Sequence, residues 1–170
     1  MSFDSMAKKI AVGDEKTFEK LYNSLYRIVF SICYSITKSE AIANDLSQET
    51  FVTVWNNSCR FNGKGYKTWI LTIARNKSLN YIKKYGKEIA VDFSEGENYL
   101  NNENNHFDLE KQIILKNAIE NLSQQDREIV LLKNAGLKHR EIAEYLGIPS
   151  GTVSWRYSEA IKILKKQVEV

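Results

Sequence analysis

The sequence predicts an all-α protein made of two small helical domains joined by an acidic flexible linker. The chain of 170 residues contains one proline and has room for two modules of this size. Apolar residues recur at steps of three and four in several long segments, as on one face of a helix. Between these segments lies a stretch rich in Asn, Glu and Gly without such a period. The expected bounds are 10–87 for the first domain, 88–110 for the linker and 111–170 for the second domain.

Three helices are expected in the first domain. Asp14 is a plausible N-cap for a long amphipathic helix, and Ser39 for a second helix that ends near Asn56 and Asn57. A loop with two glycines, Gly63 and Gly65, then leads into a third helix over 66–85. These helices form a small bundle.

The second domain is expected to begin with a short helix over 113–122. Ser123 starts a capping-box pattern for the next helix, and Gly136 is positioned to end it. A shorter apolar stretch around residues 142–146 follows, and then Gly147-Ile148-Pro149 interrupts. Ser150 is expected to cap the last helix, whose inward positions step by three or four: Val153, Tyr157, Ala160, Leu164 and Val168.

Charge is distributed unevenly along the chain, although the net charge is only +3. Residues 60–87 contain eight Lys or Arg and no acidic side chain, whereas residues 88–110 contain seven acidic and no basic side chains. Aromatic residues alternate with the basic ones in RFNGKGYKTW, which suits a surface that neutralises phosphates and stacks on bases. The alternative is a solvated, lysine-rich helix face, but such faces usually mix both signs. The acidic stretch on its own is equally consistent with a plain spacer.

The last helix carries a polar and aromatic face opposite its inward stripe. An outward Trp155 is costly on a well-packed bundle unless it meets a partner. Two helices joined by a short turn, the second with such a face, are typical of a DNA-reading helix-turn-helix. An ordinary helical corner is the alternative, but it does not explain why the turn, the cap and the exposed face coincide.

Several other classes of protein are disfavoured. Neither a signal peptide nor an apolar stretch of membrane-spanning length is found, so we expect a cytoplasmic protein. Cys33 and Cys59 lie within apparent helices at no metal-ligand spacing, and both are interpreted as core thiols. We therefore expect no metal site and no cofactor.

Two separate segments resemble one family. DLSQETFVTVWNN, followed by RFNGKGYKTWILTIARNKSLNYIKK, resembles region 2 of the extracytoplasmic-function (ECF) group of bacterial RNA polymerase sigma factors, in the sigma-70 family. LSQQDREIVLLKNAGLKHREIAEYLGIPSGTVSWRYSEAIKIL resembles region 4 of the same group. Their order, the acidic linker and the total length also fit, so the resemblance covers nearly the whole chain.

The resemblance implies roles for individual residues. In the second helix it implies contact with the clamp of the largest polymerase subunit by Asp45, Leu46, Gln48, Glu49, Phe51, Val52 and Trp55. In the following loop and helix it implies opening and reading of the minus-10 promoter element by Arg60, Phe61, Asn62, Lys64, Tyr66, Lys67, Trp69, Arg75, Asn76, Lys77, Asn80, Lys83 and Lys84. In the second domain it implies minus-35 contact by Lys138, Thr152, Ser154, Trp155, Arg156, Ser158, Glu159 and Lys162.

The implied partners are core RNA polymerase, through both of its large subunits, promoter DNA and an anti-sigma protein. The linker resembles the acidic segment that approaches the RNA path of the polymerase. No membrane insertion is implied, and we expect a monomer when the chain is free. No catalysis is expected from the chain itself, since the phosphodiester chemistry belongs to the polymerase.

The chain departs from the family pattern in the second domain. Relatives often have Lys or Arg at the position of Ser154, Ser at Trp155, Arg at Glu159 and Ser at Lys138. A carboxylate at Glu159 can accept a hydrogen bond from cytosine but repels phosphate. The preferred minus-35 sequence therefore cannot be transferred from relatives.

Two other functions remain as alternatives at this point. One is an autonomous helix-turn-helix regulator whose first domain dimerises or senses a signal; the basic, aromatic block argues against it. The other is a metal-dependent nuclease that uses carboxylates between residues 92 and 110. Catalysis needs groups held in a fixed geometry, and a flexible segment does not provide one.

Overall fold

A computed structural model describes residues 2–89 and 114–168 of the chain, and all regular structure in those ranges is helical. The chain divides into two compact units, Met1–Phe93 and Ser94–Val170. The predicted all-α class is confirmed. Apart from its first two residues, the expected linker at 88–110 lies outside the described residues.

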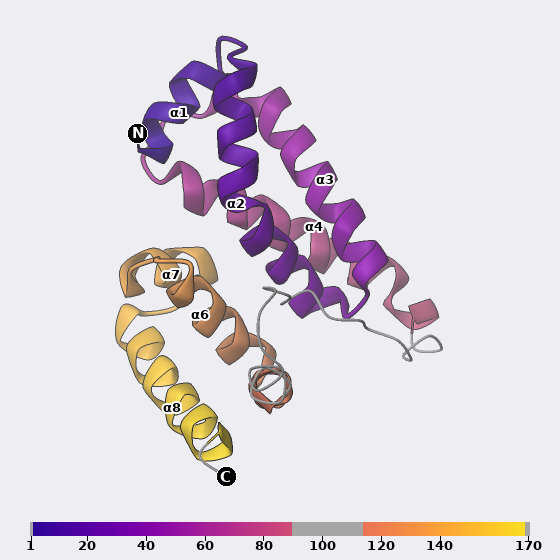
Figure 1. The fold of residues 1–170 in the computed structure, drawn as a ribbon, viewed down its shortest axis with the longest axis vertical. Helices are drawn as coiled ribbons and strands as arrows, with labels where there is room; N and C mark the ends of the chain where they lie inside the picture. Colours follow the sequence, from indigo (N-terminus) through magenta and orange to yellow (C-terminus); the bar gives the residue numbers. More distant parts are fainter. Residues whose placement is uncertain (1, 90–113, 169–170) are drawn as a thin grey trace, which may run out of the picture. The chain divides into compact units, whose positions relative to one another are not determined.

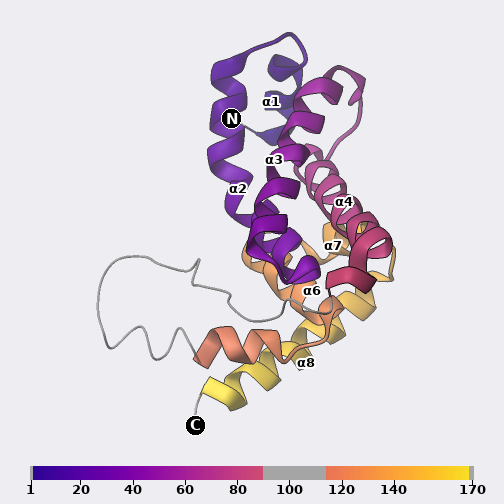
Figure 2. The same cartoon turned by 90° about the vertical axis from the view of Figure 1, so that its right-hand side faces the viewer.

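The first unit consists of four α-helices and one short 3-10 helix. These are α1 (Phe3–Ile10), α2 (Glu15–Thr37), α3 (Glu40–Asn57), η1 (Ser58–Arg60) and α4 (Tyr66–Ile89). Helices α2, α3 and α4 lie side by side and pack against one another (Figure 1 and Figure 2). Their apolar stripes meet in a core that contains Leu21, Leu25, Val29, Ile32, Ala43, Val54, Ile70, Leu71 and Ala74.

Helix α1 was not part of the expected first domain, which was predicted to start at residue 10. It packs against α2, η1 and α4, and Ala7 and Ile10 are buried beneath it. The Ser2 side chain accepts a hydrogen bond from the Ser5 backbone N–H and caps the helix. The helix is only 8 residues long, which is too short for a period of apolar residues to indicate it from the sequence.

Asp14 caps α2 as predicted. Its Oδ1 accepts a hydrogen bond from the Thr17 backbone N–H at 2.9 Å, and its Oδ2 accepts one from the Thr17 hydroxyl at 2.8 Å. These hydrogen bonds favour the charged carboxylate and hold the pKa of Asp14 below its usual value. Ser39 stands before α3 at the predicted position, but its side chain makes no capping hydrogen bond.

Thermal unfolding of Asp14→Ala against the wild-type chain is expected to show a difference in Tm that depends on pH. The native pKa of Asp14 is depressed, so its contribution is full above the ordinary carboxyl pKa of about 3.9 and is lost as pH falls through the native value. The Tm of the variant should therefore lie below that of the wild type at neutral pH, and the gap should narrow in acid. A difference in Tm that stays constant between neutral and acidic pH would contradict the role of the Asp14 carboxylate as the cap of α2.

The second unit contains a helix at residues 114–120, then α6 (Gln124–Asn134), α7 (His139–Leu146) and α8 (Ser150–Val168). Ser123 caps α6 as predicted, because its hydroxyl oxygen accepts the Asp126 backbone N–H at 3.2 Å. The prediction for Ser150 is wrong by one position. Ser150 is already the first residue of α8, and the Val153 N–H donates to the Pro149 carbonyl.

The helix at 114–120 and α6 are tied together by one arginine. The buried Arg127 guanidinium donates to the carbonyls of Ile119, Glu120 and Leu122 at 3.1, 2.6 and 3.1 Å. These carbonyls lie where the first helix ends and lack partners within it. Nearby, Ala118 and Leu122 pack against Ala160 and Leu164 of α8.

The two cysteines have different environments. Cys33 is buried, as predicted, and burial raises the pKa of its thiol. Cys59 is exposed in η1, so its interpretation as a core thiol is wrong. The end of α3 tightens into a 3-10 turn there and rotates the side chain away from the core.

Within the described ranges, the side chains form no cluster of three or more His, Cys, Asp or Glu that could hold a metal ion. No described helix has both the length and the apolar content needed to span a membrane.

Candidate functional site

Helices α2 and α3 line an open, mainly apolar groove with a volume of about 490 Å³. Four of the residues predicted to contact the polymerase lie in it: Gln48, Phe51, Val52 and Trp55. The remaining lining residues come from α2 and are Glu15, Phe18 and Tyr22. Val52 is 59% exposed on the wall, so the groove presents apolar surface to solvent.

The sequence predicts no site at these three α2 residues, because Phe18 and Tyr22 fall on the apolar stripe of a long amphipathic helix. The structure places their rings beside Phe51 and Trp55 instead. The Phe18 ring lies 5.0 Å from the Trp55 ring, and the Tyr22 ring lies 4.7 Å from the Phe51 ring, between centroids. Phe18 and Tyr22 are four residues apart and therefore lie on one face of α2, but the apolar period does not say which neighbouring helix covers which part of a wide stripe.

Leu46 and Phe51 are buried, so neither presents its side chain freely on this face. Phe51 forms the floor of the groove, and Leu46 packs in the core of the bundle. The prediction that both are surface contacts is therefore corrected to a supporting role. Asp45 and Gln48 are exposed on α3, and Glu49 is exposed but pairs with Lys77 of α4.

Tyr66 is fully buried, which contradicts its prediction as an exposed, base-stacking aromatic. Its hydroxyl is 2.6 Å from the Ser58 hydroxyl, and its ring lies 4.9 Å from that of Phe61 and 5.4 Å from that of Trp69. Phe61 and Trp69 are only half-buried. Tyr66 is thus the inner member of an aromatic cluster, and the other two rings reach the surface.

The basic block surrounds this cluster and continues along α4. Exposed side chains on the loop and helix are Arg60, Asn62, Lys64, Asn76, Asn80, Lys83 and Lys84. At 100° per residue, Asn76, Asn80 and Lys83 share one face of α4. The Lys84 ammonium lies 4.9 Å from the Tyr85 ring centroid, and interaction with the Tyr85 side chain raises the pKa of Lys84. The block can therefore hold phosphates along one face of the helix.

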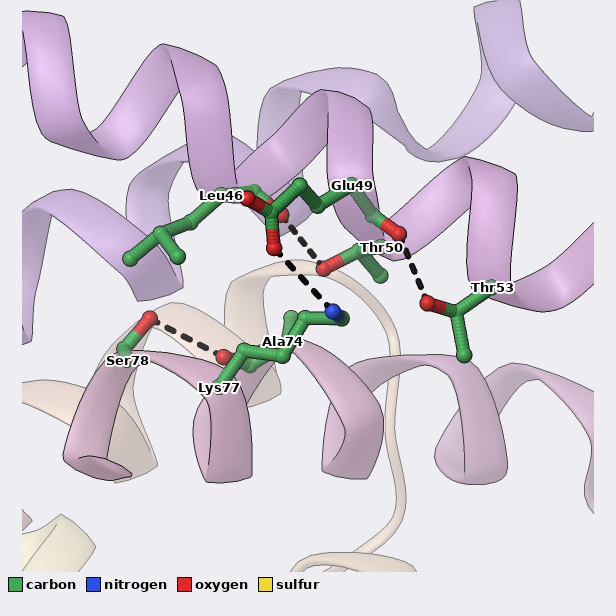
Figure 3. A network of polar contacts seen from close by, with 7 residues as sticks. All are labelled: Leu46, Glu49, Thr50, Thr53, Ala74, Lys77 and Ser78. Carbon is green, nitrogen blue, oxygen red and sulfur yellow. Dashed lines mark hydrogen bonds and ion pairs between the residues drawn. The ribbon is translucent and has the colours of Figure 1, made fainter. Parts of the chain in front are cut away.

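Some predicted DNA contacts are engaged within the protein. The Lys67 ammonium lies 5.5 Å from the centroid of the Phe3 ring on α1, and Arg75 is half-buried. Lys77 Nζ lies 3.2 Å from Glu49 Oε2 and so links α4 to α3 (Figure 3). Close approach of these two helices is possible because the buried Thr50 and Ser78 hydroxyls bond back to carbonyls of their own helices, those of Leu46 and Ala74.

The outer face of α8 is polar and aromatic, as its helical period predicts. Trp155 is 63% exposed, and Ser154 and Ser158 are exposed beside it near the N-terminal half of the helix. Thr152 is half-buried, and Lys162 Nζ lies 2.6 Å from Glu159 Oε1. This pairing partly neutralises the carboxylate that would otherwise repel phosphate.

Arg156 does not lie freely on that face. Its Nη1 donates to Asp126 Oδ1 at 2.8 Å, which ties α8 to the start of α6. Helical periodicity alone could not show this because Asp126 is 30 residues away in sequence. Lys138 is exposed and stands before α7, where its backbone N–H donates to the Glu141 carboxylate at 2.7 Å.

A double-mutant cycle on Arg156 and Asp126 is expected to show coupling. We expect Arg156→Ala and Asp126→Ala each to lower the free energy of unfolding by about 1 kcal/mol, because both remove one partly buried ion pair. The double variant should lose less than the sum of the two single losses. Denaturant unfolding of the four proteins measures this, and additive losses would show that the pair contributes nothing.

Two helical units, one with an apolar groove and a basic face and the other with an exposed helix-turn-helix, are typical of a DNA-binding protein. Residues 21–88 match the family described as Sigma-70 region 2, and residues 112–164 match Sigma-70, region 4. The chain belongs to the sigma-70 family of RNA polymerase sigma factors, in the ECF group. It is an alternative sigma factor that acts in transcription initiation, and the autonomous regulator is not favoured.

Relatives named as ECF sigma factors are similar to this chain over nearly their whole length. The "ECF RNA polymerase sigma-E factor" of Escherichia coli K12 is 28% identical over 178 residues, covering 96% of this chain and 93% of the relative. The protein of the same name from Haemophilus influenzae is 24% identical, with 97% and 94% covered.

Two solved structures are similar in fold. The sigma factor RpoE of Bartonella quintana, in complex with the anti-sigma factor NepR, has a TM-score of 0.74 and 26% identity and covers 91% of this chain and 98% of that one. CnrH in complex with the cytosolic domain of CnrY has a TM-score of 0.67 and 20% identity, with 96% and 95% covered.

Proposed function

We propose that this sigma factor docks onto core RNA polymerase through the α2–α3 groove and reads a promoter through two separate surfaces. The loop at 61–65 with the basic face of α4 reads the minus-10 element, and α8 reads the minus-35 element. The observation that carries the proposal is that the first unit has its apolar surface and its basic surface on different elements. Apolar side chains gather in the groove, whereas an excess of Lys and Arg over acidic side chains follows the loop and α4.

The groove supports protein docking rather than DNA binding. Val52, Trp55 and Phe18 offer apolar contact in the groove, and its polar lining residues are Glu15 and Gln48. Asp45 and Glu49 are exposed elsewhere on α3. Such a mixture of an apolar centre and a polar rim is typical of protein interfaces. DNA would be repelled by these carboxylates.

The loop before α4 supports contact with single-stranded bases. Asn62 and Lys64 are exposed there, and the half-buried Phe61 and Trp69 rings offer faces on which a base can stack. Exposed lysines further along α4 then hold the phosphates, which positions the strand without reading its sequence.

The α8 face supports contact in the major groove. Hydroxyls of Ser154 and Ser158 can hydrogen-bond base edges, and the Trp155 ring can contact a thymine methyl group. Thr152 and Lys162 lie on the same helix and can reach phosphates. Arg156 instead positions α8 through its ion pair with Asp126.

An anti-sigma protein is part of the proposal, supported by the likeness to RpoE of Bartonella quintana, which is bound to NepR. The groove is the surface such a protein would need to cover to block the polymerase. The chain itself supplies binding energy and positions the promoter, and it performs no bond-making step.

Run-off transcription on a genomic promoter pool tests the proposal. Core RNA polymerase with this protein should produce transcripts from defined starts that neither gives alone, with two shared upstream elements. A variant with Asn62→Ala and Lys64→Ala should bind core polymerase normally but fail to open these promoters, as measured by permanganate reactivity of unpaired thymines. Unimpaired opening would sink the assigned role of the loop, and tight palindrome binding by the chain alone would favour the autonomous regulator.

A further inference from the structure

Helix α1 lies outside both family matches, the first of which begins at residue 21, yet it touches the loop proposed to read the minus-10 element. We infer that Asp4 on α1 is a positioning residue for promoter opening, because its carboxylate fixes the point where the loop at 61–65 turns into α4. The inference rests on the proposed role of that loop.

The contact consists of two hydrogen bonds to one oxygen. Asp4 Oδ1 accepts the Gly65 backbone N–H at 3.0 Å and the Tyr66 backbone N–H at 2.8 Å. Both donors lie at the start of α4, where backbone N–H groups have no partner within the helix. A carboxylate at this end also interacts favourably with the helix dipole. Asp4 therefore serves as the N-cap side chain of a helix that begins about 60 residues later.

The local sequence cannot supply this cap. Gly65 holds the N-cap position, since its carbonyl accepts the Trp69 N–H at 3.0 Å, and glycine has no side chain to accept a hydrogen bond. Its φ of +86° lies in the left-handed region that other residues adopt only with strain. The geometry of the loop thus favours glycine, and the acceptor comes from a side chain elsewhere in the sequence, that of Asp4.

Asp4 is held in place by the docking of α1. Ala7 and Ile10 are buried on the inner side of the helix, and the Ser2 side chain caps its start. The neighbouring Phe3 ring receives the Lys67 ammonium at 5.5 Å, so α1 contacts the first turn of α4 at two adjacent points. These contacts make the carboxylate a rigid anchor rather than part of a loose terminus.

Gly65 and Tyr66, the residues that Asp4 holds, border the surface proposed to read the minus-10 element. Tyr66 is the buried member of the cluster with Phe61 and Trp69, and Asn62 and Lys64 lie on the loop between. A loop with two glycines has many accessible conformations, and the cap at Gly65 and Tyr66 restricts them. Without Asp4, only a fraction of the molecules would hold Asn62 and Lys64 in the binding geometry, and the apparent affinity would fall by that fraction.

The test compares caps that touch the loop with a cap that does not. Full-length wild type, Asp4→Ala, Asp4→Asn and the control Asp14→Ala are each assembled with core polymerase. Asp14→Ala is matched because it removes an N-cap carboxylate from α2 and has no contact with the loop. The probe is a fork-junction DNA with a single-stranded minus-10 element, taken from a promoter found by the run-off experiment. Fluorescence anisotropy gives its Kd, and competition gives the Kd for core polymerase.

We expect Asp4→Ala to weaken fork-junction binding about fivefold while core affinity stays within about twofold of wild type. Asp4→Asn keeps an acceptor oxygen and should recover most of the loss, and Asp14→Ala should bind the probe like wild type. Equal weakening by Asp14→Ala, a parallel loss of core affinity, or unchanged probe binding by Asp4→Ala would each overturn the inference.

Hydrogen exchange provides a second measurement on the free chain. The peptide that contains Gly65 and Tyr66 should exchange faster in Asp4→Ala than in wild type, whereas in Asp4→Asn, which keeps an acceptor oxygen, it should exchange at close to the wild-type rate. Unchanged exchange in Asp4→Ala would also overturn the inference. Failure of the proposed loop function is distinguishable, because Asn62→Ala with Lys64→Ala would then leave probe binding intact.

Discussion

Replacing Val52 with Glu is expected to lower the affinity of this sigma factor for core RNA polymerase by about a hundredfold. Val52 is 59% exposed on the wall of the α2–α3 groove, between Phe51 and Trp55. A carboxylate introduced there stays hydrated in the free chain but must lose water without a partner when the groove is covered. Leaving one uncompensated charge in an interface costs several kcal/mol, so a hundredfold loss, about 2.7 kcal/mol, is a moderate estimate.

The matched control for this prediction is Val12→Glu. Val12 is 84% exposed in the turn between α1 and α2 and does not line the groove. Both variants should unfold at the wild-type temperature, since each changes an exposed side chain. Competition binding to labelled core polymerase measures the affinity. Equal affinities for Val52→Glu and wild type would remove the groove from the polymerase interface.

Replacing Trp155 with Ala is expected to reduce transcription from promoters with a minus-35 element by about tenfold. The ring is 63% exposed on α8, so its loss should not affect folding. A contact that reads one base pair contributes about 1 to 3 kcal/mol, which corresponds to a loss of affinity between about fivefold and 150-fold, so tenfold is a moderate expectation. Run-off transcription and binding to minus-35 duplex DNA measure the two effects together.

Ile163→Ala is the control for Trp155. Ile163 is also an exposed apolar residue on α8, 46% accessible, but it lies about two turns further from the start of the helix. Its replacement should leave both readouts unchanged. If Trp155→Ala lowered activity equally on promoters whose minus-35 element had been scrambled, the ring would not read that element.

Local patterns were sufficient for the predicted all-α class and for most helix positions. Caps at Asp14 and Ser123 follow from short-range rules, because the capping side chain and its N–H donor are three residues apart. The inward positions Val153, Ala160 and Leu164 are buried as their spacing predicted. An exposed Trp155 followed from the same helical period.

Part of the candidate site depends on which helix faces pack against each other. The helical period of one segment does not contain this information. Tyr66 is buried against Ser58, Arg156 faces Asp126, and Phe18 belongs to the groove rather than to the deep core. Each outcome requires a partner from another helix. A helical period defines the direction of a side chain but not the element that lies opposite.

Among these contacts, the one made by Asp4 is the hardest to predict from the sequence. Asp4 caps α4 but lies in a segment outside the predicted domains. The sequence specifies the glycine that leaves the start of α4 without an acceptor. Packing of α1 against η1 and α4 brings in the carboxylate that satisfies it. Composition and helical period are properties of neighbouring residues and can be read along the chain, whereas contacts between residues about 60 positions apart arise only when the helices pack.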